Sequence, residues 1–127
     1  MIHEKLLKPK SILVVGGSDD IQKPGGKVLK NLQDGNFKGD LYVSNPKAEE
    51  VQGIKSYKNI ADLPEVDLAI LAVAAKYCYD TIETLADKNN TRGFIILSAG
   101  FSEESEEGGK IEEAIVEKVN SVGGSLI

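Results

Sequence analysis

The stretch from Ile12 to Leu32 constrains the fold of this chain more than any other part of its sequence. It opens with a run of aliphatic residues, Ile12 to Val15, which is typical of a strand buried on both faces of a parallel sheet. A glycine pair and Ser18 follow, so the backbone can turn tightly there and offer N–H groups to an anion beside the start of a helix. We predict that this helix begins near Pro24 to Gly26 and ends at Gly35.

Other apolar runs continue the same pattern along the chain. Leu68 to Val73 and Phe94 to Leu97 read as buried strands, and Leu41 to Val43 reads as a shorter one. Helical spacing of apolar residues predicts helices over Tyr77 to Asn89 and through Ile111 to Val122. The alternation of strand and helix predicts an α/β fold with a doubly wound, mostly parallel sheet, whose ligands bind at the carboxyl ends of the strands.

The remaining segments are shorter. We expect Glu49 to Gln52 to make one helical turn that Gly53 breaks, and Ile54 to Tyr57 to be extended. Ser125 to Ile127 reads as the start of another inner strand. Because the sequence stops inside this apolar strand, we expect residues 1–127 to be one domain of a longer, multidomain chain.

The charge and cysteine content restrict the classes of partner. Fifteen basic residues against 20 acidic ones give a net charge of -5, which argues against nucleic acid or an anionic membrane as the main partner. No apolar run approaches the roughly 20 residues of a membrane span. Cys78 is the only cysteine, so an intrachain disulfide and a cysteine-rich zinc site are excluded, and its helical position predicts packing in or near the core. We therefore expect a cytoplasmic chain without a metal site.

No group of residues predicts catalysis. His3 is the only histidine, and no grouping of an acid and a nucleophile lies near it, so we expect no catalytic residue among these 127. The glycine-serine turn also lacks the G-x-G-x-x-G spacing of a nicotinamide fingerprint, because Ser18 and Ile21 stand where glycines are expected. Lys27 is followed by Val28, which excludes a P-loop.

The end of the second strand carries an unusual group of residues. A dinucleotide-binding unit normally has Asp or Glu there, which accepts hydrogen bonds from the ribose hydroxyls. This chain has Asn45, Pro46 and Lys47 instead. An amide and an ammonium suit a ribose that bears a phosphate, whereas a plain Asn-Pro turn with a solvated lysine explains the same residues equally well. Ala74 and Ala75, after a later strand, allow either room for a ligand or close helix packing.

Five segments in order carry a family resemblance: VVGGSDDIQKPGGKVLKNL, YVSNPK, GIKSY with DLPEVDLAIL, VAAKYC, and IILSAGFSEESEEGG. Together they resemble the amino-terminal CoA-binding domain of nucleoside-diphosphate-forming acyl-CoA synthetases, over nearly the whole chain. ADP-forming acetate-CoA ligase is the nearest member, and the succinyl-CoA synthetase α-subunit is a more distant relative. The family usually has Val-Pro in place of Val73-Ala74 and Val-Asn-Pro in place of Ser44-Asn45-Pro46.

The resemblance implies a Rossmann-like domain with coenzyme A across the carboxyl edge of the sheet. The implied contacts are Gly16, Gly17 and Ser18 under the pyrophosphate, with Lys23, Gly25 and Gly26 nearby; Asn45, Pro46 and Lys47 beside the adenosine and its 3′-phosphate; and Val73, Ala74, Ala75, Ser98, Ala99, Gly100 and Phe101 along the pantetheine arm.

The resemblance also implies an activity for the full-length enzyme, which interconverts acyl-CoA, ADP and phosphate with the acid, CoA and ATP through a phosphohistidine in a later domain. The implied partners are CoA or acyl-CoA and the remaining synthetase domains or subunit, and this domain alone is expected to catalyse nothing. Three alternatives stay open: a stand-alone CoA-binding regulatory protein, an NAD-binding redox-sensing domain, and a protein acetyltransferase that carries the same region.

Overall fold

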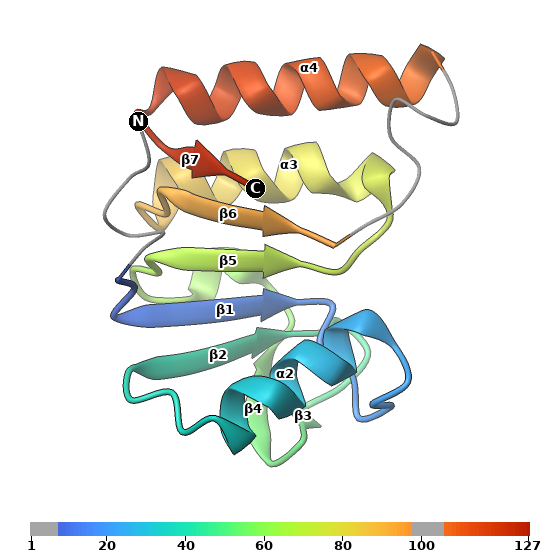
Figure 1. Cartoon of the computed structure of the whole chain (residues 1–127), viewed down its shortest axis with the longest axis vertical. Coiled ribbons are helices and arrows are strands. Elements are labelled where there is room, and N and C mark those ends of the chain that lie inside the picture. Colours follow the sequence, from blue (N-terminus) through green and yellow to red (C-terminus); the bar gives the residue numbers. More distant parts are fainter. Residues whose placement is uncertain (1–7, 98–105) are drawn as a thin grey trace.

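The computed structural model describes residues 8–97 and 106–127. Within them, a seven-stranded sheet has the order β3-β4-β2-β1-β5-β6-β7 (Figure 1). All neighbouring strands are parallel except the β3–β4 pair. The elements are β1 (Ser11–Val15), α2 (Pro24–Asp34), β2 (Asp40–Ser44), β3 (Glu50–Val51), β4 (Ile54–Tyr57), the 3₁₀ helix η1 (Ile60–Asp62), β5 (Leu68–Leu71), α3 (Ala75–Lys88), β6 (Gly93–Ile96), α4 (Glu106–Ser121) and β7 (Ser125–Leu126). The predicted mostly parallel α/β sheet is confirmed.

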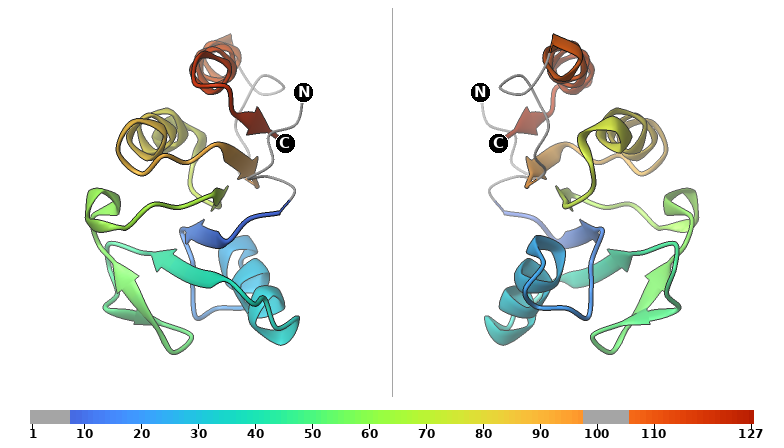
Figure 2. Two further views of the ribbon diagram at one scale, coloured as in Figure 1. Left: turned by 90° about the vertical axis from the view of Figure 1, so that its left-hand side faces the viewer. Right: turned by 90° about the vertical axis from the view of Figure 1, so that its right-hand side faces the viewer.

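Helices cover both faces of the sheet, so the fold is doubly wound. Figure 2 shows α2 on one face and α3 on the other. The crossover from β1 to β2 passes through α2, and the crossover from β5 to β6 passes through α3, so the winding reverses between the neighbouring strands β1 and β5. Open α/β sheets bind ligands at such a switch point, beyond the carboxyl ends of the strands.

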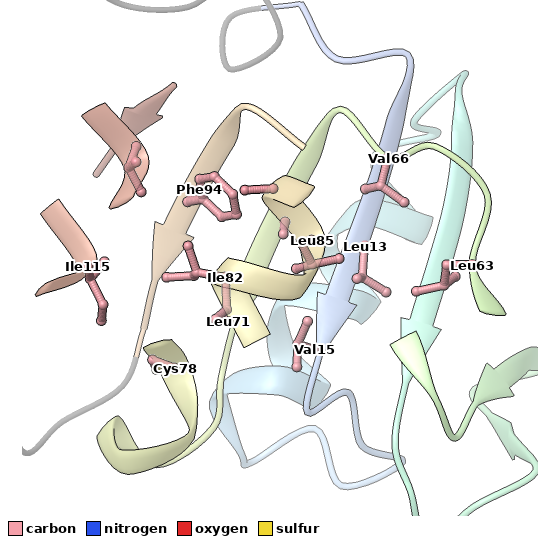
Figure 3. Close-up of a cluster of buried hydrophobic side chains, with 13 residues drawn as sticks. Leu13, Val15, Leu63, Val66, Leu71, Cys78, Ile82, Leu85, Phe94 and Ile115 are labelled. Atoms are coloured by element: carbon pink, nitrogen blue, oxygen red, sulfur yellow. The ribbon is translucent and has the colours of Figure 1, made fainter. Parts of the chain in front are cut away.

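The larger core cluster lies between the sheet and α3 (Figure 3). Leu13 from β1, Ile82 and Leu85 from α3, and Phe94 from β6 are fully buried in it. The fully buried Cys78 belongs to the same cluster, which confirms its predicted place in the core. This packing holds the start of α3 against the end of β5. The start of α3 therefore lies beside the switch point between β1 and β5.

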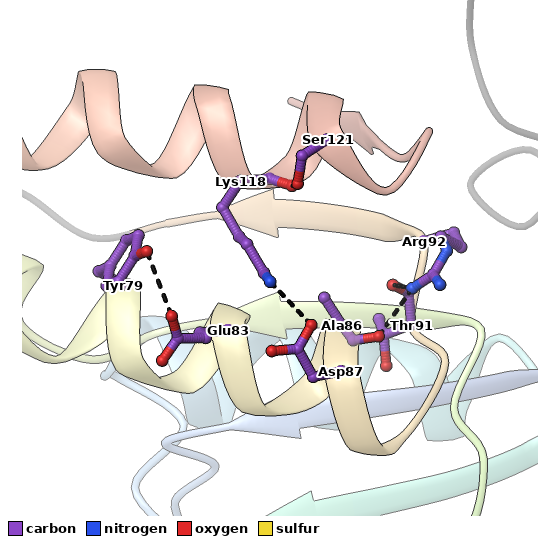
Figure 4. A network of polar contacts seen from close by, with 8 residues as sticks. All are labelled: Tyr79, Glu83, Ala86, Asp87, Thr91, Arg92, Lys118 and Ser121. Atoms are coloured by element: carbon purple, nitrogen blue, oxygen red, sulfur yellow. Dashed lines mark hydrogen bonds and ion pairs between the residues drawn. The ribbon is translucent and has the colours of Figure 1, made fainter.

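An ion pair joins α4 to α3, and two further polar contacts lie along α3 (Figure 4). Lys118 Nζ of α4 lies 2.7 Å from Asp87 Oδ1 of α3, and this hydrogen bond raises the pKa of Lys118. The neighbouring Glu83 carboxylate raises the pKa of Tyr79. Arg92 Nη1 donates to the carbonyl oxygen of Ala86 at 2.9 Å, which satisfies a carbonyl in the last turn of α3.

The predicted helical turn at Glu49–Gln52 is wrong, because β3 and β4 form an antiparallel hairpin instead. The almost fully buried Val51 packs in the core cluster under α2, and this burial outweighs the local preference of the segment. Gln52 and Gly53 form the two-residue turn with φ angles of 49° and 82°, as a type I′ turn requires. A non-glycine residue in the left-handed region costs about 1–3 kcal/mol and persists only where its surroundings hold it.

Residues 8–97 and 106–127 lack two classes of feature. No helix there is long and apolar enough to cross a membrane. The same ranges contain no group of three or more His, Cys, Asp or Glu side chains that could hold a metal ion.

Candidate functional site

The turn after β1 closes directly against the end of β5. Gly16 has a φ of 85°, and its N–H donates to the carbonyl oxygen of Ser44 at 2.9 Å. A Cβ atom on Gly16 would lie 2.6 Å from the carbonyl oxygen of Ala72 and 3.1 Å from Val73 Cγ1. Only glycine therefore allows this turn to sit over the switch point between β1 and β5.

The first turn of α2 packs on the same backbone. A Cβ atom on the buried Gly25 would overlap the carbonyl oxygen of Gly16, so a side chain there would push the helix away from the turn. The N-cap residue Lys23 makes no side-chain capping hydrogen bond, and the first turn contains no acidic residue. The first turn of α2 thus supplies no carboxylate of its own to the positive end of the helix dipole.

Side-chain amides from later segments anchor the carbonyl groups of the loop that joins β1 to α2. Asn45 Nδ2 donates to the carbonyl oxygen of Gly17 at 3.0 Å, and Gln52 Nε2 donates to that of Ser18 at 2.8 Å. In contrast, no atom in the described part of the chain accepts a hydrogen bond from the backbone N–H of Gly17, Ser18 or Asp19. Unpaired loop N–H groups beside a helix start are the kind of donor that anion-binding sites use.

Asn45 shapes this edge of the sheet through both ends of its amide. Besides the bond to Gly17, its Oδ1 accepts from the backbone N–H of Lys47 at 2.9 Å. The backbone N–H of Asn45 donates to Ser56 Oγ at 2.9 Å. Asn45 therefore forms the predicted Asn-Pro turn and ties it to the loop, while the Lys47 side chain stays exposed.

A groove of about 780 Å³ runs along the carboxyl edge on the α3 side. Four predicted site residues line it: Pro46, Lys47, Val73 and Ala74. They come from the segments after β2 and β5, as expected for the ends of parallel strands. No acidic side chain of the described residues lines the groove, so its two lysines, Lys47 and Lys58, favour an anionic ligand.

Sequence reasoning missed some residues of this groove. Lys58 and Asn59 follow β4, which pairs in parallel with β2, so the end of β4 reaches the same edge. Had Ile54 to Tyr57 been predicted as a strand parallel to the others, Lys58 and Asn59 would have been expected at the carboxyl edge. Tyr77 and Thr81 line the groove from the first turns of α3, and Tyr77 is 57% exposed.

The other predicted site residues are arranged in three ways. Gly16, Gly17, Ser18, Lys23, Gly25 and Gly26 gather at the turn and at the start of α2. Ala75 is buried as the first residue of α3, so close helix packing explains it, whereas Ala74 is exposed at the groove. Ser98, Ala99, Gly100 and Phe101 lie outside the described residues.

Comparison with known families assigns the chain to a class of domain. The family model for the CoA binding domain matches residues 10–124. The chain therefore belongs to the CoA-binding domain family, and the molecule bound by this family is coenzyme A.

Individual relatives are synthetases. The chain is 41% identical over 113 residues to ADP-forming acetate-CoA ligase II of Archaeoglobus fulgidus, covering 88% of this chain and 17% of that protein. It is 40% identical over 120 residues to the α-subunit of ADP-forming acetate-CoA ligase II of Pyrococcus furiosus, covering 94% and 26% respectively. The chain thus spans about a quarter or less of these relatives.

A solved structure agrees with the computed fold. The acetyl-coenzyme A synthetase 1 of Ca. Korarchaeum cryptofilum, in complex with phosphate and ADP, superposes with a TM-score of 0.87 and 33% sequence identity. The match covers 98% of this chain and 26% of that one. The Rossmann-like α/β fold expected from the sequence is the fold of that synthetase region.

Proposed function

We propose that this chain is the CoA-binding domain of an ADP-forming acyl-CoA synthetase and that it holds CoA across the carboxyl edge of its sheet. One observation carries this proposal: the loop after β1 turns its carbonyl groups into the protein and keeps the N–H groups of Gly17, Ser18 and Asp19 unpaired among the described residues. A pyrophosphate is the part of CoA that such donors suit, beside the uncapped start of α2.

The adenosine end of CoA is proposed to lie beside Asn45, Pro46 and Lys47. The groove supports this because Lys47 and Lys58 both line it and no described acidic side chain opposes them. Two ammonium groups suit the 3′-phosphate that distinguishes CoA from a dinucleotide. An NAD-binding domain would use a carboxylate to accept hydrogen bonds from the ribose hydroxyls. This chain has the amide of Asn45 at that position instead.

The pantetheine arm is proposed to follow Val73 and Ala74. Both residues line the groove, and Ala74 is small and exposed. Ser98 to Phe101 remain the predicted continuation of this path. The described residues of this chain bind and orient CoA, and we assign none of them a catalytic role.

The whole enzyme is proposed to interconvert acyl-CoA, ADP and phosphate with the acid, CoA and ATP. Relatives bearing the name ADP-forming acetate-CoA ligase support this reaction class. Further synthetase domains or a second subunit would supply the chemistry, and residues 1–127 would be one domain of that assembly. The proposed setting is the cytoplasm, where the free thiol of Cys78 suits a reducing compartment.

Calorimetric titration with CoA and with dephospho-CoA tests the proposal. We predict that wild type binds CoA roughly tenfold more tightly, because a hydrogen-bonded ion pair with the 3′-phosphate contributes about 1.4 kcal/mol. Lys47→Ala should lose most of this preference, and Lys88→Ala, an equal charge change at the far end of α3, should keep it. Equal affinities of wild type for both ligands, or binding of NAD instead of CoA, would contradict the proposal.

A further inference from the structure

Gln52, at the tip of the β3–β4 hairpin, donates three hydrogen bonds to the loop after β1 and to the first turn of α2. Its backbone N–H donates to Asp19 Oδ1 at 2.7 Å. Its side-chain Nε2 donates to the carbonyl oxygen of Ser18 at 2.8 Å and to that of Gly26 at 2.9 Å. One amide group therefore bridges the loop after β1 and the first turn of α2, although Gln52 is 34 residues from Ser18 in the sequence.

The backbone of Gln52 is in a conformation that its side-chain type does not favour. With a φ of 49°, this position of a type I′ turn suits Asn, Asp or Gly better than Gln. Asn carries the same amide on a side chain one methylene shorter, so it would relax the turn but not reach both carbonyl oxygens. The longer side chain at a strained position points to a role in the loop rather than in the hairpin.

We propose that Gln52 is a positioning residue for the phosphate of the bound coenzyme, an inference that rests on the proposed function. By holding the carbonyl oxygen of Ser18, Gln52 fixes the peptide group that it shares with the unpaired N–H of Asp19, and the bond to the Gly26 carbonyl ties this peptide to the first turn of α2. Its backbone N–H also engages the Asp19 carboxylate, whose charge would otherwise oppose an anion. Gln52 acts through the loop, and we expect no direct contact with the ligand.

This role predicts a specific kind of affinity loss. When only a fraction of molecules holds the loop in the binding conformation, the apparent dissociation constant rises by the inverse of that fraction. Removing two neutral hydrogen bonds from the loop should weaken CoA binding roughly three- to tenfold. The loss should be equal for CoA and dephospho-CoA, because Gln52 lies at the pyrophosphate end and not beside Lys47.

Three variants of the chain separate the loop from the hairpin. Gln52→Ala removes the bridging amide, and Gln52→Asn restores a residue suited to the turn without restoring the reach. Gln33→Ala is the matched control, because among the described residues Gln33 Nε2 donates only to the backbone carbonyl of Gln52, at 3.2 Å. We expect both Gln52 variants to lose affinity alike, Gln52→Asn to be the more stable of the two, and Gln33→Ala to bind CoA within about twofold of wild type.

NMR order parameters of the ligand-free chain provide the second readout. In Gln52→Asn, the backbone order parameters of Ser18 to Asp20 should fall from about 0.85, the value of a rigid backbone, toward 0.6, the value of a mobile loop. Wild-type affinity in Gln52→Asn, with or without a mobile loop, would overturn the proposal. If wild type does not bind CoA but the loop of Gln52→Asn becomes mobile, the proposed ligand is wrong and the anchoring by Gln52 stands.

Discussion

Replacing Gly16 by Ala tests whether the turn after β1 depends on a side-chain-free contact with β5. The new Cβ atom would lie 2.6 Å from the carbonyl oxygen of Ala72, so one backbone must retreat by most of an ångström to reach ordinary contact near 3.4 Å. Overpacking of this kind costs about 1–3 kcal/mol. The φ of 85° adds a left-handed penalty for Ala of about 1–2 kcal/mol. We expect Gly16→Ala to lower the free energy of unfolding by about 2–5 kcal/mol.

A second glycine isolates the contact from the backbone strain. Gly123 has a φ of 72°, but nothing lies within 4 Å of the Cβ atom that Ala would add there. Gly123→Ala should therefore cost only the left-handed penalty, about 1–2 kcal/mol. Urea unfolding followed by circular dichroism measures the loss of unfolding free energy in both variants. Calorimetric titration measures their CoA affinity, at about 10–20 °C because folded proteins are typically most stable there. The reasoning is refuted if the two variants unfold at the same midpoint and bind CoA equally well.

Two further changes test the core and the outer helix. Leu85→Ala should lower the free energy of unfolding by about 2–5 kcal/mol, because Leu85 is fully buried between α3 and the sheet; a loss under about 1 kcal/mol in urea unfolding would contradict that packing. Lys118→Met tests the contact with Asp87, which raises the pKa of Lys118 in the folded state. The contact therefore contributes its full stabilisation at pH values below the ordinary lysine pKa. The stability difference between wild type and Lys118→Met should shrink as pH rises through that folded-state pKa, and a difference that grows there would contradict the assignment.

The elements with strong local signals could be predicted from the sequence. The apolar runs Ile12 to Val15 and Leu68 to Val73 predict buried strands, and β1 and β5 are buried at the centre of the sheet, although β5 already ends at Leu71. The apolar spacing in α3 placed Cys78 in the core. The helix begins at Ala75 instead of Tyr77 and ends at Lys88 instead of Asn89, because helix termini have weaker patterns than interiors.

The parts that could not be predicted depend on contacts between distant segments. The residues Glu49 to Gln52 have no strand pattern of their own, and their hairpin forms because Val51 is buried against Leu29 and Val43. Lys58 belongs to the groove only because β4 pairs in parallel with β2. Propensity is a weak prior for such short segments, and tertiary packing decides their structure.

The loop after β1 does not have the spacing of a dinucleotide fingerprint, but it leaves the N–H groups of Gly17, Ser18 and Asp19 unpaired among the described residues. In that fingerprint, glycines provide a tight turn and a close approach of helix to strand. Here Gly16 provides the turn and Gly25 the close approach, so the intervening segment is longer than the fingerprint allows. A longer loop has more conformational freedom to lose on ordering. Asn45 and Gln52 hold its carbonyl groups from outside, which replaces local glycine geometry by long-range hydrogen bonds.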